Sequence, residues 1–361
     1  MTTPLAHPLA IRRALNPKTD PINGHKGVDL GDGTQLLSVR MAICQALYEE
    51  MQRDPTIFVM GEEVAQYNGA YKVTKGLLDI FGAERVIDTP ITEGGFTGLA
   101  VGAAMTGLRP VIEFMSWNFS FVAFDQIISN ASKMNYMTGG MFPIPLVMRG
   151  PNGAGPRVSS QHSHAVEALY AHFPGLLVVS PSTPYDAKGL MKTALRQNNP
   201  VCFLENEMIY NLEQEIPKAD YAIPFGQADL KREGGDCTIV AISRSVHWSL
   251  EAAAELAKEG IECEVLDPRT IKPLDIDAIV RSVKKTNRCV VVEECYRTGG
   301  LGAEIAAQLM ELAFDDLDAP VGRVTTTENP MPYAANLEHE TLPKPHRIIA
   351  AVRQACYRTQ L

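Results

Sequence analysis

Short apolar runs alternate with helical segments along most of this sequence, and that alternation strongly constrains the fold. Apolar residues recur at three- and four-residue spacing in SVRMAICQALYEEMQRD (38–54), which predicts an amphipathic helix. Strand-like runs follow, most of them separated by helical segments: TIFVM (56–60), RPVIEF (109–114), IPLVMR (144–149), LLVVS (176–180) and PVCFLE (200–205). Such alternation predicts a parallel sheet covered by helices on both faces.

The alternation stops and then starts again, which predicts two domains. Residues 216–236 are irregular and polar and are interpreted as a linker. After them come the strand-like runs CTIVAI (237–242), IECEVL (261–266), RCVVVEE (288–294) and VGRVTT (321–326). Helices are predicted near 246–259, 275–285, 302–313 and 343–356. We therefore predict an α/β fold with mostly parallel sheets in two tandem domains, 36–215 and 237–361, preceded by an N-terminal arm, 1–35.

Composition and charge narrow the classes of function. The chain has 361 residues, 45% of them hydrophobic, which is enough for two cores. Its formal net charge of -9 disfavours unaided binding to nucleic acid or an anionic membrane. No run approaches the roughly 20 apolar residues that span a bilayer. The seven cysteines lack metal-type spacing, so we expect thiols in a reducing compartment, either the bacterial cytoplasm or, if residues 1–35 are a transit segment, an organellar matrix.

Glu93 stands immediately before a run of small residues. In DTPITEGGFTGLAVGAAMTG (88–107), glycines and alanines leave little bulk on the predicted helix, so another backbone can approach it closely. The positive end of a helix favours an anion, which suits a functional carboxylate. An ordinary capping carboxylate explains the same pattern, and the residues alone leave both interpretations open.

Other chemically capable residues also follow predicted strands. Glu62, in GEEVAQYNGAYKV (61–73), lies where open α/β sheets place functional groups, although a solvated turn is the alternative. The aromatic segment EFMSWNFSFVAFDQIISN (113–130) is suited to stack a flat heterocycle or to pack a core. The glycine-rich segment RGPNGAGPRVSSQHSHAVEALY (149–170) carries two histidines that either line a site or lie on the surface.

Several longer strings resemble one enzyme family. In order, they are GEEVAQYNGAYKVTKGL, DTPITEGGF, AVGAAMTGLRPVIEFM, RGPNGAG, QHSH, DAKGLMKTALR, LENEMIY and DAPVGRVTT, and they resemble the beta subunits of 2-oxo acid dehydrogenases, of the pyruvate type. The resemblance covers about 36–355 and implies a thiamine pyrimidine-binding domain followed by a transketolase carboxyl-terminal domain. It implies oxidative decarboxylation of pyruvate and reductive acetylation of a lipoyl group. Branched-chain 2-oxo acids or acetoin are the alternative substrates.

The resemblance also implies roles for individual residues. Glu93, in the TPITE string, would hydrogen-bond the aminopyrimidine of thiamine diphosphate and promote its activation. Glu62 would be the second carboxylate of a proton path, and Phe119 would pack on the pyrimidine. His162 would help with the substrate or with the lipoyl group at the channel mouth.

Metal sites are expected on this chain and on a partner. A potassium site made largely of main-chain carbonyls would fall near Leu146, Ala194, Gln197 and Asn199, with Gln197 where many relatives have an acidic residue. GDGT (31–34) begins like a diphosphate-binding motif, but no asparagine pair follows about thirty residues later. The resemblance therefore implies that an alpha subunit holds the magnesium and the diphosphate, in an assembly of two alpha and two beta subunits.

The second domain is expected to dock the peripheral domain of a dihydrolipoyl acyltransferase core. Four acidic residues are candidates to face a basic partner, namely Glu293, Glu294, Asp315 and Asp316. Plain surface charge is the alternative. A non-catalytic scaffold is a further alternative, but the presence of Glu93, Phe119 and His162 together argues against it.

Overall fold

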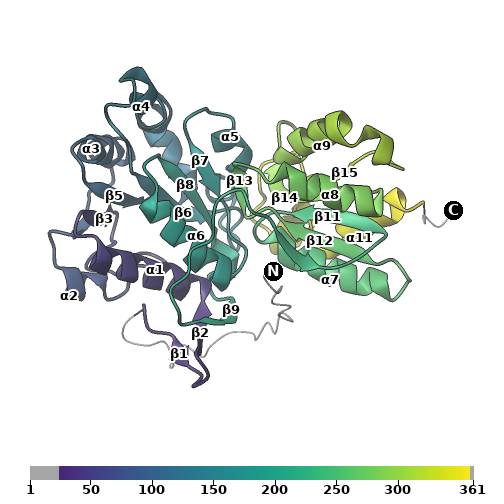
Figure 1. Ribbon diagram of the computed structural model, residues 1–361, viewed down its shortest axis with the longest axis horizontal. Coiled ribbons are helices and arrows are strands. Elements are labelled where there is room, and N and C mark those ends of the chain that lie inside the picture. The colour runs from purple at the N-terminus through teal and green to yellow at the C-terminus, as the bar shows by residue number, and fades with distance from the viewer. Residues whose placement is uncertain (1–23, 358–361) are drawn as a thin grey trace.

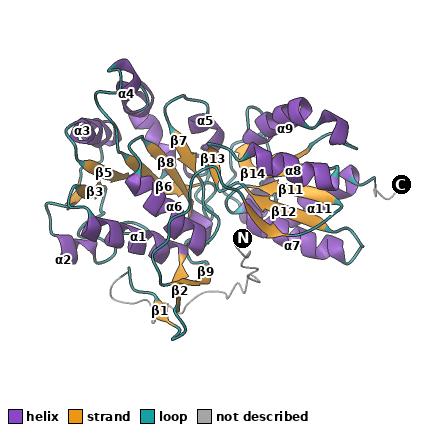
Figure 2. Cartoon of the chain, in the orientation of Figure 1, coloured by secondary structure: helices purple, strands orange, loops and turns teal. Residues whose placement is uncertain are grey.

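Two α/β domains lie side by side along the longest axis of the computed structural model, which describes residues 24–357 (Figure 1). Most of the predicted arm therefore lies outside the described residues. Each main sheet packs helices on both faces, and the strands run through the middle of each domain (Figure 2). This arrangement confirms the predicted α/β class.

The first domain is built on a seven-stranded sheet of order β13-β7-β8-β6-β5-β3-β4. Its strands are β3 (Ile57–Gly61), β4 (Val86–Asp88), β5 (Arg109–Glu113), β6 (Val147–Asn152), β7 (Leu177–Val179), β8 (Val201–Asn206) and β13 (Thr270–Lys272). All neighbouring pairs are parallel except β13 with β7. Along β3, Ile57 and Val59 enter one core while Phe58 and Met60 enter the other, so both faces of the strand are apolar.

Helices and short turns cover this sheet. They are α1 (Val39–Arg53), α2 (Leu77–Phe81), α3 (Glu93–Met105), η2 (Trp117–Ala123), η3 (Gln126–Ala131), α4 (Met134–Met137), η4 (Ser160–His162), α5 (Glu167–Ala171), α6 (Pro184–Arg196) and η5 (Glu207–Ile209). Helix α1 begins after Ser38, whose hydroxyl accepts the amide of Met41 and caps the helix. Helices α1 and α6 pack together over one face, whereas α3, η2 and η3 lie over the other.

The second domain has a five-stranded sheet of order β10-β12-β11-β14-β15. Its strands are β10 (Asp229–Arg232), β11 (Cys237–Ala241), β12 (Cys263–Asp267), β14 (Cys289–Tyr296) and β15 (Gly322–Thr326). Only β10 is antiparallel to its neighbour. The helical elements are α7 (Ser245–Ala257), α8 (Ile276–Thr286), α9 (Leu301–Leu312), η6 (Phe314–Asp316), α10 (Ala335–Thr341) and α11 (Pro345–Ala355).

A small antiparallel sheet joins the segment before α1 to the segment after η5. It contains β1 (Val28–Asp29), β2 (Thr34–Ser38) and β9 (Glu213–Pro217). Strand β2 thus starts within the predicted arm, and β10 lies within the predicted linker. Both strands depend on pairing with distant segments, β9 and β12, rather than on a long apolar run of their own.

A buried ionic network fixes the junction of the two domains. Asp186, near the start of α6, accepts from Lys231 of β10 and from Arg269, with distances of 2.7 Å to each. Burial is the largest influence on the pKa of Asp186 and raises it, but the two cations outweigh it and hold that pKa at about 2. Asp186 is therefore a carboxylate at neutral pH, and the ion pairs tie the domains together.

None of the helices within residues 24–357 is long and apolar enough to cross a bilayer. All seven cysteines fall within this range and are free thiols.

Candidate functional site

The candidate site lies at the carboxyl edge of the parallel strands in the first domain. Glu62 directly follows β3, and Glu113 is the last residue of β5. Strand β3 lies between β4 and β5 in the sheet, so the next two strands along the chain pair with opposite edges of β3. Crevices at such points are where open α/β sheets bind ligands.

Glu93 is the first residue of α3, and its side chain is buried, with 6% exposed. Glycines allow this helix to lie close to its neighbours. A Cβ atom on Gly94 would lie 3.3 Å from the carbonyl oxygen of Val122, and one on Gly98 would lie 3.1 Å from Oε1 of Gln126. The small residues therefore serve packing against η2 and η3, which places Glu93 next to the aromatic segment.

Glu62 is buried beside other carboxylates. Its side chain is 5% exposed, and its Oε1 atom makes no hydrogen bond within the described part of the chain. Burial first, and then the negative charges of Glu93 and Glu113, raise the pKa of Glu62 to about 7. A carboxyl with a pKa near neutrality is able to take up and release a proton at physiological pH.

Arg149, in β6, stabilises this edge of the sheet, and the sequence analysis did not identify it as part of the site. Its guanidinium is fully buried and pairs with the carboxylates of Glu113 and Glu205. The hydroxyl of Tyr210 donates to Glu205 at 2.6 Å. An arginine inside a buried strand requires carboxylate partners, so the RG pair after LVM was the signal that could have found this group.

Phe119 and His162 lie together, as the resemblance implies for residues of one site. Phe119 is in η2 with 36% exposed, and its ring centroid is 5.1 Å from that of the exposed His162. Some rings of the predicted aromatic segment pack the core and others lie at the surface. Phe114 and Trp117 are fully buried in the core. Only the outer rings of η2 are therefore open to a ligand, and these include Phe121.

The four residues proposed for potassium lie at the opposite, amino edge of the sheet. The carbonyl of Leu146 accepts an amide from β8, and that of Ala194 accepts the amide of Gln197 at 3.2 Å. The carbonyl of Gln197 accepts from the guanidinium of Arg109, while Asn199 is exposed nearby in the chain. Side chains of the metal-binding types His, Cys, Asp and Glu form no metal-holding group among residues 24–357. Main-chain carbonyls are therefore the donor set that a cation would meet here.

The predicted docking role of Glu293 and Glu294 is wrong, because both side chains are buried in β14. Glu293 accepts the amides of Leu301 and Gly302 at the start of α9, at 2.9 and 2.7 Å. Glu294 accepts the amide of Ala154 at 3.0 Å. Burial raises the pKa of Glu293 to about 7 even though these amides lower it. The acidic pair therefore holds loops in place and is not presented to a partner.

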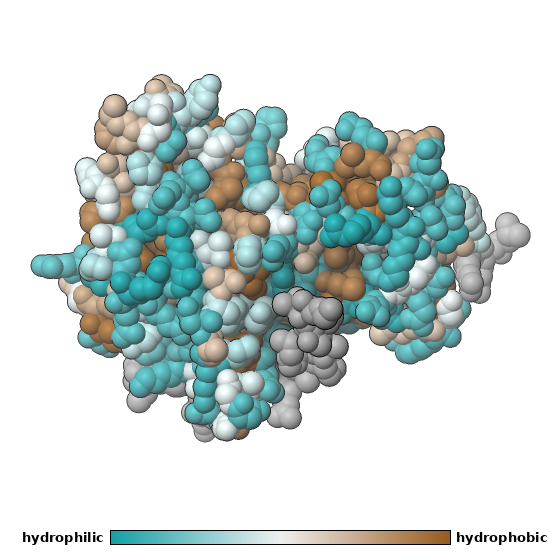
Figure 3. Space-filling view, in the orientation of Figure 1, coloured by the Kyte–Doolittle hydropathy of each residue, from teal (hydrophilic) through white to brown (hydrophobic). Residues whose placement is uncertain are grey.

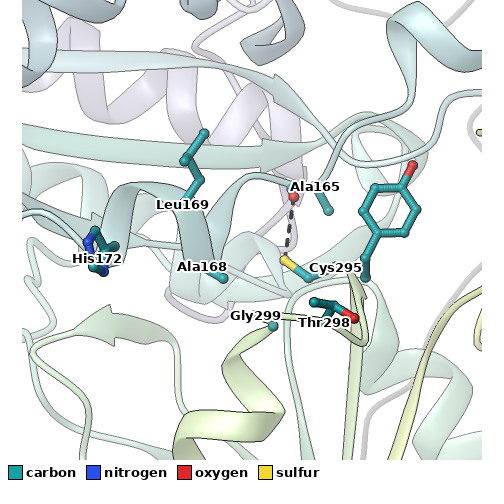
Figure 4. Close-up of a pocket in the computed structure, with 9 residues that line it drawn as sticks. Ala165, Ala168, Leu169, His172, Cys295, Thr298 and Gly299 are labelled. Carbon is teal, nitrogen blue, oxygen red and sulfur yellow. Dashed lines mark hydrogen bonds between the residues drawn. The ribbon is translucent and has the colours of Figure 1, made fainter. Parts of the chain in front are cut away.

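A separate cleft lies between the two domains, between α5 and α9. It consists of two adjoining hollows of about 360 and 460 Å³, which share Ala168, His172, Gly299 and Gly300. Figure 4 shows its wall, where the thiol of Cys295 donates to the carbonyl oxygen of Ala165 at 3.4 Å. None of the predicted site residues is among the residues that line it, so this cleft is distinct from the carboxylate site.

Comparisons with known proteins identify the domains and the relatives. The family described as transketolase, pyrimidine binding domain, matches residues 35–213, and transketolase, C-terminal domain, matches residues 226–348. The pyruvate dehydrogenase E1 component subunit beta of Rickettsia felis is 55% identical over 321 residues, which is 89% of this chain and 98% of that protein. The mitochondrial one of Mus musculus is 54% identical, over 88% of this chain and 90% of that protein.

A solved structure shares the fold. It is described as a split gene transketolase, inactive beta4 tetramer, with a TM-score of 0.72 over 90% of this chain and 99% of that chain. Its sequence identity to this chain is 24%, so the likeness concerns the fold alone.

Proposed function

Because this chain belongs to the family of pyruvate dehydrogenase E1 component beta subunits, we propose that it activates thiamine diphosphate through Glu93. The reaction is the oxidative decarboxylation of pyruvate with reductive acetylation of a lipoyl group. The observation that carries the proposal is a buried carboxylate at the start of α3, beside a second buried carboxyl at Glu62.

Bound thiamine diphosphate supplies an electron sink for the decarboxylation of a 2-oxo acid. Glu93 acts as the acid–base group that shares a proton with a ring nitrogen of the aminopyrimidine. Glu62 serves as a proton reservoir for Glu93, because its pKa of about 7 keeps both of its protonation states populated at neutral pH. Burial of both side chains excludes bulk water from competing for these protons.

Phe119 and His162 are assigned to the mouth of the same site. The partly exposed ring of Phe119 offers a face for stacking against a pyrimidine. His162 is exposed and lies against that ring, so it is placed to meet the substrate or an incoming lipoyl group. An imidazole is suited to this task because its ring nitrogens can donate and accept hydrogen bonds.

An alpha subunit is proposed to cover exposed apolar residues around α3 and α4. Large apolar side chains are exposed there to between 60% and 90%, namely Ile91, Leu99, Val122, Tyr136, Met137 and Met141. Figure 3 shows one face of the molecule, on which hydrophobic patches lie among hydrophilic side chains in both domains. Clustered apolar surface of this kind marks a protein interface. The proposed partner would supply the magnesium and diphosphate site, in an assembly of two alpha and two beta chains.

Potassium is proposed to bind at the amino edge of the sheet. The carbonyl oxygens of Leu146, Ala194 and Gln197 are hard donors, and each retains a second lone pair beside its hydrogen bond. Melting the assembled protein in potassium and in sodium chloride at equal ionic strength tests the site. A higher melting temperature in potassium supports it, and equal values contradict it.

The second domain is proposed to dock an acyltransferase core. Asp315 is exposed in η6 and Asp316 is half-buried, so this turn remains a candidate contact for a basic partner. Capture of the assembly on the isolated peripheral domain of the acyltransferase, at low and high salt, tests whether the contact is electrostatic. Binding that does not weaken with salt would contradict it.

The proposed function is tested by co-expression with a candidate alpha subunit. Decarboxylation of pyruvate, of branched-chain 2-oxo acids and of acetoin is measured with and without thiamine diphosphate. We expect activity only with both subunits and the cofactor, and the highest kcat/KM for pyruvate. Preference for a branched-chain acid or for acetoin would support the second candidate function instead, and cofactor-independent activity would contradict both.

A further inference from the structure

The loop that carries His162, residues 153–165, is defined here as the histidine loop. Its backbone is strained at two positions, because Arg157 and Ser159 have φ values of 57° and 67°. Residues other than glycine rarely adopt this left-handed conformation and do so where surrounding contacts enforce it. The contacts that enforce it therefore decide where His162 lies.

The tip of the histidine loop is held by the second domain. The backbone amide of Arg157 donates to Oε2 of Glu338 on α10 at 2.7 Å. The hydroxyl of Ser160 donates to the carbonyl oxygen of Met331 at 2.8 Å. Met331 is itself buried, with 1% exposed, so its carbonyl is a fixed point.

The base of the loop is also bonded to the second domain. The amide of Ala154 donates to Glu294 at 3.0 Å, and its carbonyl accepts from Arg244 at 3.3 Å. At the other end, the thiol of Cys295 donates to the carbonyl of Ala165 at 3.4 Å. From the first domain, Asn118 accepts the amide of His164 at 2.8 Å. The loop thus belongs to the first domain in sequence but takes most of these bonds from the second.

We propose that the second domain positions the site histidine, with Glu338 as the positioning residue that holds the histidine loop so that His162 stays against Phe119. The inference rests on the proposed function only for what His162 does. Glu338 is suited to this role because a carboxylate accepting an amide forms a charge-assisted bond, stronger than a neutral one. It is the side-chain acceptor for the strained Arg157 backbone.

The contact is partly open to solvent, so its loss is expected to loosen the loop rather than unfold the domain. Glu338 is half-buried and Arg157 is exposed, which lets water replace the lost acceptor. A histidine displaced by about 1 Å is enough to slow a reaction step substantially. The effect should therefore be seen in local exchange and in turnover more than in melting temperature.

The test uses the enzyme assembled with its alpha subunit and loaded with thiamine diphosphate. Four variants are compared with wild type: Glu338→Ala, which removes the acceptor, Glu338→Gln, which keeps an acceptor oxygen, Glu340→Ala, and His162→Ala, which removes the imidazole. Glu340 is the matched control, because it is exposed on the same helix and pairs on the surface with His339. Hydrogen–deuterium exchange of residues 156–163 and kcat for acetylation of a free lipoyl domain are measured for each.

We expect Glu338→Ala to exchange roughly threefold to tenfold faster in residues 156–163, as for the loss of one hydrogen bond, and to lose about tenfold in kcat. Glu340→Ala should match wild type in both measurements, and Glu338→Gln, whose neutral oxygen makes a weaker bond, should lie between wild type and Glu338→Ala. Unchanged exchange in Glu338→Ala overturns the inference, and so does faster exchange with wild-type turnover while His162→Ala is impaired. If His162→Ala itself turns over normally, the proposed role of His162 fails, and the exchange data still decide whether Glu338 holds the loop.

Discussion

The rings of Phe119 and His162 lie at a centroid distance of 5.1 Å and an interplanar angle of 68°, which brings the aromatic turn η2 into contact with a loop distant in sequence. If Phe119 stacks on the cofactor, Phe119→Ala should weaken binding of thiamine diphosphate by about 1 kcal/mol, roughly fivefold in Kd. Titration of the assembled enzyme measures this. Phe314→Ala, an exposed ring in the second domain, is the control and should leave Kd unchanged. Equal affinities for Phe119→Ala and wild type would remove Phe119 from the site.

Glu62 gives the purified chain a pH dependence that can be worked out in sign. The folded-state pKa of about 7 lies above the ordinary value of 4.5, because of burial and then of neighbouring carboxylates. Folding is therefore favoured by protonated Glu62 at low pH, and this contribution is lost as the pH rises from about 4.5 through 7. We expect the free energy of unfolding of Glu62→Gln, relative to that of wild type, to be larger at pH 8 than at pH 5. Urea unfolding at the two pH values measures this.

Gln66 supplies the control for that experiment, because its side chain is exposed in the loop after β3 and carries no titratable group. Gln66→Ala should differ from wild type by the same amount at both pH values. A Glu62→Gln difference that stays constant between pH 5 and pH 8 would show that this carboxyl does not titrate as described.

Arg149 should be among the most sensitive positions for stability. Arg149→Met leaves Glu113 and Glu205 buried without their cation, which costs about 3–5 kcal/mol for a broken buried pair. Burial raises the pKa of Glu113, so the loss should shrink at low pH, where protonation of Glu113 removes an uncompensated buried charge. Urea unfolding measures it, and Arg281→Met on the exposed face of α8 should change stability by less than about 0.5 kcal/mol. A loss below about 1 kcal/mol for Arg149→Met would mean that the network tolerates the missing cation.

Gly102 tests where the alpha subunit approaches. It is exposed on α3, three residues after the exposed Leu99, and a Cβ atom there would meet nothing within 4 Å. Gly102→Ala should therefore stabilise the chain by up to about 1 kcal/mol through helix propensity.

Gly102→Phe should weaken assembly with the alpha subunit, measured by analytical ultracentrifugation. Ala254→Phe, exposed on α7 of the second domain, is the control, and equal assembly of both phenylalanine variants would place the interface elsewhere.

Local patterns predicted much of the architecture. Strands β3, β5, β8 and β11 could be predicted from the sequence, because strands buried on both faces are continuous hydrophobic stretches. Strands β4 and β13 were not predicted. Each has three residues and is specified by long-range pairing, and β13 even leaves its own domain to pair with β7. Such pairing leaves no local signal.

The site residues were likewise predictable where a local pattern marks them and not where a long-range contact defines their role. Glu62 and Glu93 were identifiable because each stands at the end of a recognisable element and within a family string. Glu293 and Glu294 were misassigned because adjacent acidic residues usually mark a surface, whereas here they accept amides in the interior. Glu338 had no signal at all, since its role depends on the contact between two domains.

The central claim is that Glu93 exchanges a proton with the cofactor, and turnover of the assembled Glu93→Gln enzyme on pyruvate tests it most directly. Glutamine keeps the shape and the hydrogen-bonding capacity of the side chain but has no acid–base function at neutral pH. With assembly and thiamine diphosphate binding verified as unchanged, we predict that kcat falls by about two orders of magnitude or more. A kcat within a few-fold of wild type would contradict the claim.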